Sequence, residues 1–287
     1  MIALIFSILS STFIFVIFKL FKKYQVNTLH AIVFNYYTAC AFGLLHYKTP
    51  VNITTILNAK WLIGAIVLGV LFITVFNIMA LTVQKNGLSV ASVASKMSVV
   101  IPIVFGIYLY HEKLGVLKIV GIVFALIAVY LTSIKEKKVV FNSKGLWLPL
   151  SLFLGAGIID TFINYIENTY LEPDSIPIFS ATIFCFAGLI GTLLILVKST
   201  KPPLNLSYKS VVGGFFLGVA NYYSIHYILL ALQSKHLESS IVFTINNVAI
   251  VATSTLLGLL LFKEKLITKN WIGIGLALLS IILIVNS

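Results

Sequence analysis

The amino-acid sequence predicts an all-α integral membrane protein, and three observations lead to this fold class. Of the 287 residues, 60% are hydrophobic and only 10% are charged, whereas a soluble domain carries about 25% charged residues. The mean hydropathy is +1.07. The apolar residues also form continuous runs that match a bilayer core, which needs about 20 residues at about 1.5 Å of rise each. A soluble fold, a disordered chain and a secreted scaffold stapled by the two cysteines are therefore excluded.

Ten apolar runs have this length, and each is expected to be a transmembrane helix. In chain order they are Ile2–Leu20, Leu29–Tyr47, Trp61–Val83, Leu88–Leu109, Gly115–Ser133, Leu146–Ile166, Ile176–Val197, Lys209–Leu232, Glu238–Leu261 and Ile267–Val285. Residues 84–87 and 110–114 are connections too short for extramembrane domains. Because the runs are continuously apolar, they do not fit the alternating strands of a membrane β-barrel.

The charges separate these runs and predict an orientation. The net charge is +12, and all the basic residues are lysines that lie singly or in twos and threes between apolar runs. This pattern is typical of loops beside membrane spans rather than of a nucleic-acid groove. One face collects fourteen lysines and the other five, with an acidic loop at residues 167–174. The positive-inside rule then predicts a cytoplasmic fourteen-lysine face and both termini outside.

The chain contains an internal repeat. Glu112-Lys113-Leu114 recurs as Glu264-Lys265-Leu266, 152 residues later. At the same offset and at an offset of 149, ordered matches follow: Gly106 with Gly258, Gly121 with Gly273, Ile122 with Ile274, Ala125 with Ala277, Leu126 with Leu278, Leu68-Gly69-Val70 with Leu217-Gly218-Val219, and Gln84 with Gln233. The predicted domains are residues 1–138 and 139–287, each a five-helix repeat. Since five is odd, the second copy is inverted, which is a recurrent architecture of secondary transporters with a substrate site near the midplane.

The repeated motif resembles the EamA-type transporters of the drug/metabolite transporter superfamily. Pro102, residues 111–114 and Gly121 with residues 125–126 are similar to the signature of that family, and residues 262–266 with Gly273 are similar to it again. Pro102 has no proline counterpart, because Ser254 stands at the equivalent position. The resemblance implies a carrier of amino acids or other small metabolites in a bacterial inner membrane, often an exporter, that works by alternating access. It also implies a central cavity lined by the third, fourth, eighth and ninth spans.

Polar residues at membrane depth are costly and mark candidate sites. Lys96 lies about 12 Å into the fourth span, and Ser92 and Ser95 share its helix face. The repeat places Thr244 and Asn247 of the ninth span at matching positions. We expect these residues to line a substrate cavity. Alternatively, Lys96 extends to the membrane interface and the small polar residues serve helix packing.

Two further sets of candidates lie in other spans. Asp160 of the sixth span is a candidate ion-pair partner of Lys96 or a proton-coupling carboxyl, with a static structural pair as the alternative. Asn77 and His226 occupy equivalent positions of the third and eighth spans, and Asn221 and Tyr222 accompany His226. These four could bind a substrate, or they could link helices by hydrogen bonds. Pro102 predicts a kink that could act as a gating hinge. Glu264 is expected to favour the start of the helix that follows it.

The predicted function is a secondary transporter, an exporter or exchanger of small polar metabolites such as amino acids, and not an enzyme. The expected partners are a small-molecule substrate, membrane lipids and a second copy of the chain as a homodimer, with no nucleic acid, metal or cofactor. The sequence has no H-E-x-x-H zinc helix, no nucleophile elbow and no P-loop. An intramembrane enzyme without a recognisable motif or a passive channel remains the alternative. Saturable counter-transport separates a carrier from a channel.

Overall fold

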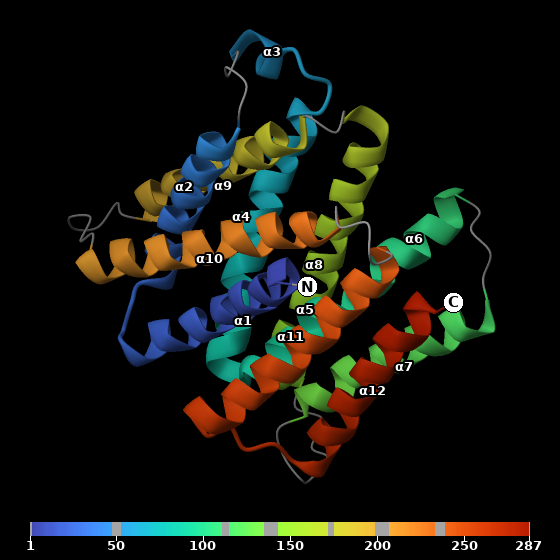
Figure 1. Ribbon diagram of the computed structural model, residues 1–287. Coiled ribbons are helices and arrows are strands. Elements are labelled where there is room, and N and C mark those ends of the chain that lie inside the picture. The colour runs from blue at the N-terminus through green and yellow to red at the C-terminus, as the bar shows by residue number, and fades with distance from the viewer. Residues whose placement is uncertain are drawn as a thin grey trace. The chain divides into compact units, whose positions relative to one another are not determined.

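The computed structural model describes residues 2–47, 53–110, 115–134, 143–171, 175–198, 207–232 and 239–286, and these residues form helices without any strand. The predicted all-α fold class is confirmed. The helices are α1 (Ile2–Lys23), α2 (Thr28–His46), α3 (Ile53–Leu57), α4 (Leu62–Asn86), α5 (Leu88–Met97), α6 (Val100–Tyr110), α7 (Val116–Ser133), α8 (Ser143–Tyr170), α9 (Ile176–Lys198), α10 (Tyr208–Leu232), α11 (Ser239–Phe262) and α12 (Thr268–Val285), as Figure 1 shows.

The helices coincide with the ten predicted spans, with two differences. The fourth span is divided into α5 and α6, and the short helix α3 was not predicted. Among the described residues, seven helical stretches are long and apolar enough to cross a membrane, and α7 and α12 contain shorter apolar helices. Large apolar side chains are exposed along these helices, for example Leu45 at 79% and Ile63 at 76%. Since hydrocarbon and not water surrounds such a surface, exposed apolar residues are the expected lipid-facing side.

The chain packs as two compact units that are each built from several segments. Unit 1 comprises Met1–Lys19, Ile78–Ile158 and Tyr223–Ser287, and unit 2 comprises Leu20–Asn77 and Ile159–Tyr222. Helices α1, α4, α8 and α10 each contribute one end to each unit. Both units therefore contain segments of both predicted halves of the sequence.

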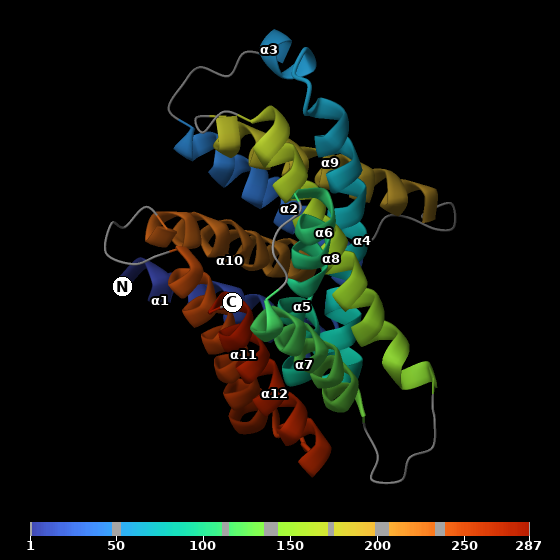
Figure 2. The same cartoon turned by 90° about the vertical axis from the view of Figure 1, so that its right-hand side faces the viewer.

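Unit 1 is organised around the pair of helices α7 and α12, which lie side by side in Figures 1 and 2. A Cβ atom at Gly121 would lie 2.6 Å from Ile284, and one at Gly273 would lie 2.9 Å from Thr132. These two contacts are equivalent under the 152-residue offset of the sequence repeat, since 121 matches 273 and 132 matches 284. The start of each helix therefore meets the end of the other, in the reciprocal arrangement expected of two inverted copies.

Polar side chains fasten the same pair of helices. The buried amide nitrogen of Asn270 lies within 3.0 Å of the carbonyl oxygens of Leu131, Thr132 and Ile134, at the carboxyl end of α7. The hydroxyl of Ser280 donates to the carbonyl of Gly121 at 2.7 Å. The bonds of Asn270 satisfy backbone acceptors that the end of a helix otherwise leaves unpaired.

The apolar core of unit 1 lies where α5, α7, α11 and α12 meet. Buried members of this core include Met97 of α5, Ala125 and Ala128 of α7, Val251 of α11 and Ala277 of α12. Alanine at the facing positions of α7 and α12 lets the two helices approach closely. In this core α5, which carries Lys96, packs against the helix pair.

In unit 2, helices α2 and α9 form the corresponding pair. Tyr36 of α2 is fully buried, donates its hydroxyl hydrogen to the carbonyl of Phe72 at 2.7 Å and stacks against Phe184 of α9. Helix α10 also packs closely against α2 at a small residue. A Cβ at Gly214 would lie 2.5 Å from the carbonyl oxygen of Ala31 in α2.

Candidate functional site

The partly exposed polar side chains of α5 lie on its last turn. The first seven residues of α5 are buried, whereas the side chains of Ser95 and Lys96 are half-buried. The hydroxyl of Ser92 is fully buried and donates to the carbonyl of Ser89 at 3.0 Å. Ser95 and Lys96 are therefore the predicted site residues of α5 whose side chains remain accessible, while Ser92 is bonded within its own helix.

A break in the helix follows directly after Lys96, and its cause lies in the sequence. Pro102 has no backbone N–H, so it cannot donate to the carbonyl of Ser98 four residues earlier. That carbonyl instead accepts from the N–H of Ile101 at 2.9 Å, in a tighter turn. The Ser98 hydroxyl donates to the carbonyl of Ser95 at 2.6 Å. The helix is interrupted at residues 98–99, one turn before the proline, while the kink and its role as a hinge remain predictions.

Because α5 ends at this break, its carboxyl end carries the partial negative charge of a helix terminus. The carbonyls at the carboxyl end of a helix carry partial negative charge, which favours a cation in the last turn. Lys96 occupies that turn. A broken transmembrane helix with polar groups at the ends of its halves is the usual form of a solute or ion site in secondary transporters.

Helix α11 carries the matching candidates and is continuous. Ser254 stands where the repeat would have a second proline, and its hydroxyl donates to the carbonyl of Val251 at 3.0 Å. Asn247 is half-buried on α11, which packs against α5. The side chain of Thr244 lies outside the described residues. The two equivalent spans are therefore asymmetric, because only the first contains the proline.

The remaining candidate of unit 1, His226, lies on α10 in an aromatic cluster. The ring of His226 lies 6.0 Å from that of Tyr223 and 5.5 Å from that of Tyr227, measured between centroids. Tyr227 also stacks on Phe6 of α1 at 5.2 Å. The half-buried imidazole of His226 therefore lies among π-systems, an environment that can accommodate a cationic group.

Three of the candidates in unit 2 contact neighbouring helices or their own helix. Asn221 is buried and donates to the side-chain oxygen of Asn35 in α2 at 3.3 Å. The ring of Tyr222 lies 5.2 Å from that of His46, also in α2. Asn77 donates to the carbonyl of Ile73 in its own helix at 2.7 Å. The contacts of Asn221 and Tyr222 are of the helix-linking kind that the sequence left as the alternative, whereas Asn77 bonds within its own helix.

Asp160 and Lys96 belong to different units. Asp160 lies on the part of α8 that belongs to unit 2, and its side chain is exposed. Lys96 lies in unit 1. Their pairing remains a prediction.

An apolar groove lies elsewhere in unit 1, between α1 and α11. It has a volume of about 410 Å³ and includes Phe13, Val16 and Leu257 among its lining residues. At this seam the hydroxyls of Thr12 and Thr253 are hydrogen-bonded at 2.8 Å. None of the predicted site residues lines this groove, whose mostly apolar wall resembles the lipid-facing surface rather than a polar solute site.

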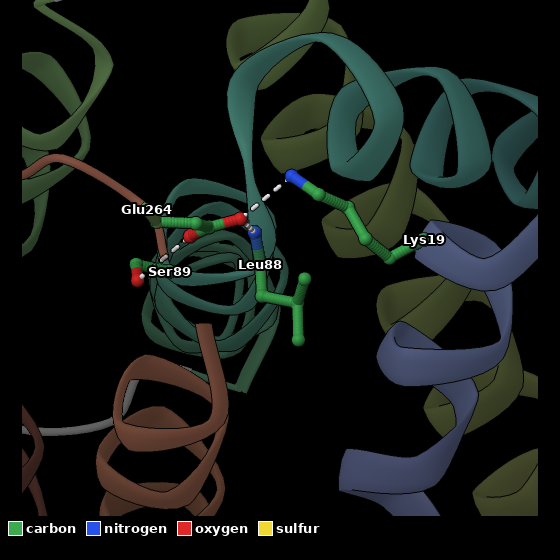
Figure 3. A network of polar contacts seen from close by, with 4 residues as sticks. All are labelled: Lys19, Leu88, Ser89 and Glu264. Atoms are coloured by element: carbon green, nitrogen blue, oxygen red, sulfur yellow. Dashed lines mark hydrogen bonds and ion pairs between the residues drawn. The ribbon is translucent and has the colours of Figure 1, made fainter. Parts of the chain in front are cut away.

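Sequence reasoning missed one polar network in unit 1. The carboxylate of Glu264, in the loop between α11 and α12, accepts from the ammonium of Lys19 at 2.8 Å and from the N–H of Leu88 at 2.8 Å (Figure 3). The hydroxyl of Ser89 lies 3.4 Å from the second carboxylate oxygen. Glu264 was expected to favour α12, the helix that follows it. It caps the amino end of α5 instead, because the loop folds back against that helix.

Among the described residues, no group of three or more His, Cys, Asp or Glu side chains is arranged to hold a metal ion. The free thiols of Cys40 and Cys185 are half-buried in α2 and α9. The predicted site residues offer an ammonium, hydroxyls, amides and an imidazole. Such groups bind and orient a polar solute by charge and hydrogen bonds.

Comparison with known proteins agrees with a fold of apolar membrane helices. A model of the EamA-like transporter family matches residues 1–134, a stretch that contains the first five predicted spans. An uncharacterized protein of Haemophilus influenzae (strain ATCC 51907 / DSM 11121 / KW20 / Rd) is 30% identical over 287 residues, which cover 97% of this chain and 95% of that protein.

Proposed function

Because the chain belongs to the EamA-like transporter family, within the drug/metabolite transporter superfamily, we propose that it is a secondary transporter that exchanges or exports a small polar metabolite by alternating access. The family makes it a membrane transporter with a small-molecule substrate in a lipid environment. An amino acid or a related metabolite is the proposed substrate class, and a bacterial inner membrane is its proposed location.

The broken helix whose last turn carries Lys96 supports this proposal most strongly. Lys96 and Ser95 lie on the last turn of a ten-residue half-helix, and the break of residues 98–99 follows them. Placing a charged side chain at membrane depth costs free energy, so such residues usually have a functional role. An ammonium at this position would bind an anionic group of the solute, such as a carboxylate, while the Ser95 hydroxyl offers a hydrogen bond.

The remaining candidates are proposed as secondary determinants. Asn247 and Thr244 on α11, and His226 on α10, would orient the other end of the solute. Ser92, Asn77, Asn221 and Tyr222 would contribute only after exchanging the contacts described above, so their substitution is expected to affect affinity less than that of Lys96. Asp160 is proposed as a proton-coupling carboxyl or as the counter-ion of Lys96.

Counterflow in proteoliposomes tests the proposal. Vesicles loaded with unlabelled amino and organic acids are assayed for saturable uptake of the labelled compound. A carrier gives saturable counterflow, and Lys96→Met, which keeps most of the side-chain volume but removes the charge, is expected to reduce it at least tenfold, the factor for about 1.4 kcal/mol of lost binding.

The matched control is Lys23→Met, which removes an exposed lysine at the end of α1 and should leave counterflow unchanged. Flux that does not saturate would favour a channel. Saturable counterflow that is equal in wild type and Lys96→Met would remove Lys96 from the site while leaving the carrier function intact.

A further inference from the structure

The carboxylate of Glu264 holds together three separate parts of unit 1. Lys19 belongs to α1, Leu88 begins α5, and Glu264 lies in the loop after α11 (Figure 3). The Glu264 and Lys19 side chains are 9% and 21% exposed. Such partial burial limits screening by water and salt, so this ion pair is stronger than one on an open surface.

The chain is built to admit this carboxylate. Gly87, the N-cap of α5, has a φ of 110°, a conformation that glycine adopts without strain. A Cβ at Gly87 would lie 2.8 Å from the Glu264 carboxylate, and one at Gly258 would lie 2.7 Å from it. The backbone N–H of Glu264 also donates to the carbonyl of Gly258 at 3.0 Å. Two glycines far apart in sequence thus leave room for one side chain.

The helix that Glu264 caps is the one that carries Ser95 and Lys96. With ten residues, α5 is about 15 Å long. Its amino end is held by the Glu264 carboxylate, and its carboxyl end stops at the break of residues 98–99. A short rigid helix with one fastened end and one hinged end can move as a lever.

The ion pair between Lys19 and Glu264 can also open. Lys19 is the more exposed partner, and its long apolar stem allows the ammonium to swing toward water. After that movement, the Glu264 carboxylate still accepts from the N–H of Leu88 and lies close to the Ser89 hydroxyl, so it is not left as an isolated buried charge. Release of Lys19 therefore costs less than the separation of a buried ion pair without other partners.

We propose that Glu264, paired with Lys19, is a positioning residue that latches the amino end of α5, and that release of this pair allows α5 to pivot at residues 98–99 during transport. The inference rests on the proposed function, because it assigns the moving element of the same site. The latch determines from which side Ser95 and Lys96 are reached. It acts on access and not on direct contact with the solute.

Thiol accessibility measures this movement without requiring transport. The reporter is Ser95→Cys, in a chain whose native cysteines are replaced by Cys40→Ala and Cys185→Ala, and it is labelled with a membrane-impermeant maleimide in vesicles of defined orientation. Glu264→Gln keeps an oxygen acceptor for the N–H of Leu88 but removes the charge. Lys19→Gln removes the other charge and leaves the cap of α5 intact.

Each substitution is expected to increase the labelling rate from the Lys19 side of the membrane by about five- to tenfold and to lower it from the opposite side, within the range of known coupling between sites. The double substitution should have no larger effect than either single one, because both remove the same pair. The matched control, Lys23→Gln, removes an exposed lysine of the same helix and should change neither rate.

Two results would overturn the latch. Labelling rates that stay unchanged while thermal stability falls would make the pair a static fastening, and rates that rise equally from both sides would indicate general loosening. If Glu264→Gln does not fold, Lys19→Gln decides alone, since it retains every contact of Glu264 with α5. Absence of counterflow in the wild type would refute the proposed function, whereas one-sided labelling changes would still establish the latch.

Discussion

Replacing Gly273 with alanine probes the contact between α7 and α12 that organises unit 1. The new Cβ would lie 2.9 Å from the backbone nitrogen of Thr132 and 3.0 Å from the Cβ of Leu131. A backbone atom cannot move aside as a side-chain end can, so the two helices must separate. Gly275, on the same helix, provides the matched control, because a Cβ added there would meet no atom within 4 Å.

The magnitude follows from comparing these two substitutions. Glycine to alanine in a helix interior gains about 1 kcal/mol of helix propensity at both positions. Overpacking a tight contact costs about 1–3 kcal/mol, and this cost applies only at Gly273. We therefore expect Gly275→Ala to stabilise the protein by up to about 1 kcal/mol. Gly273→Ala should be less stable than Gly275→Ala by about 1–3 kcal/mol.

Unfolding of the detergent-purified protein by heat or by SDS, followed by circular dichroism, measures the difference. The free energy of unfolding is compared between the two variants under identical conditions, which cancels the contribution of the detergent. If Gly273→Ala were as stable as Gly275→Ala, the close contact of α7 and α12 would be refuted, and with it the reciprocal packing of the two repeats.

Two other predictions concern single side chains. Asn270→Ala leaves the carbonyls of Leu131, Thr132 and Ile134 without their donor and should lower the free energy of unfolding by about 1–3 kcal/mol. The control is Asn286→Ala, which removes an exposed bond to Ile282 at the end of α12. Equal effects of the two substitutions would contradict this role of Asn270. Pro102→Ala supplies the N–H of residue 102, which can donate to the Ser98 carbonyl as in a regular α-helix. The fourth span should become more continuous and more stable by about 1 kcal/mol, and counterflow should become slower. Faster counterflow in that variant would refute the hinge.

The spans could be predicted from the sequence because the transfer of a side chain into hydrocarbon is a local property. Every predicted run coincides with one helix, or for the fourth run with the pair α5 and α6, to within a few residues at its ends. The repeat was visible for a similar reason, since equivalent positions such as Gly121 and Gly273 face the same packing demand. Gly121 packs against Ile284 and Gly273 against Thr132, and these equivalent close contacts explain why glycine stands at both positions.

The polar residues were harder to interpret, because a side chain in a helix can bond its own backbone, another helix or a solute. Ser92 and Asn77 bond carbonyls of their own helices, and Asn221 bonds Asn35 of a helix far away in the sequence. All three are small polar residues within apolar spans, so residue type and spacing do not separate them. Only the position of the neighbouring helix distinguishes them.

The sequence by itself determined the all-α membrane fold and its apolar helices, because hydrophobicity acts within a few residues of the chain. It also predicts the inverted repeat and, from the missing N–H of Pro102, an interruption of the fourth span. The tertiary structure decided that the break precedes Pro102 by a turn and that Ser95 and Lys96 are the accessible groups of α5. It also decided that Glu264 caps α5. Glu264 and Leu88 are 176 residues apart, and a partner at such a distance is set by how the loops bring helices together.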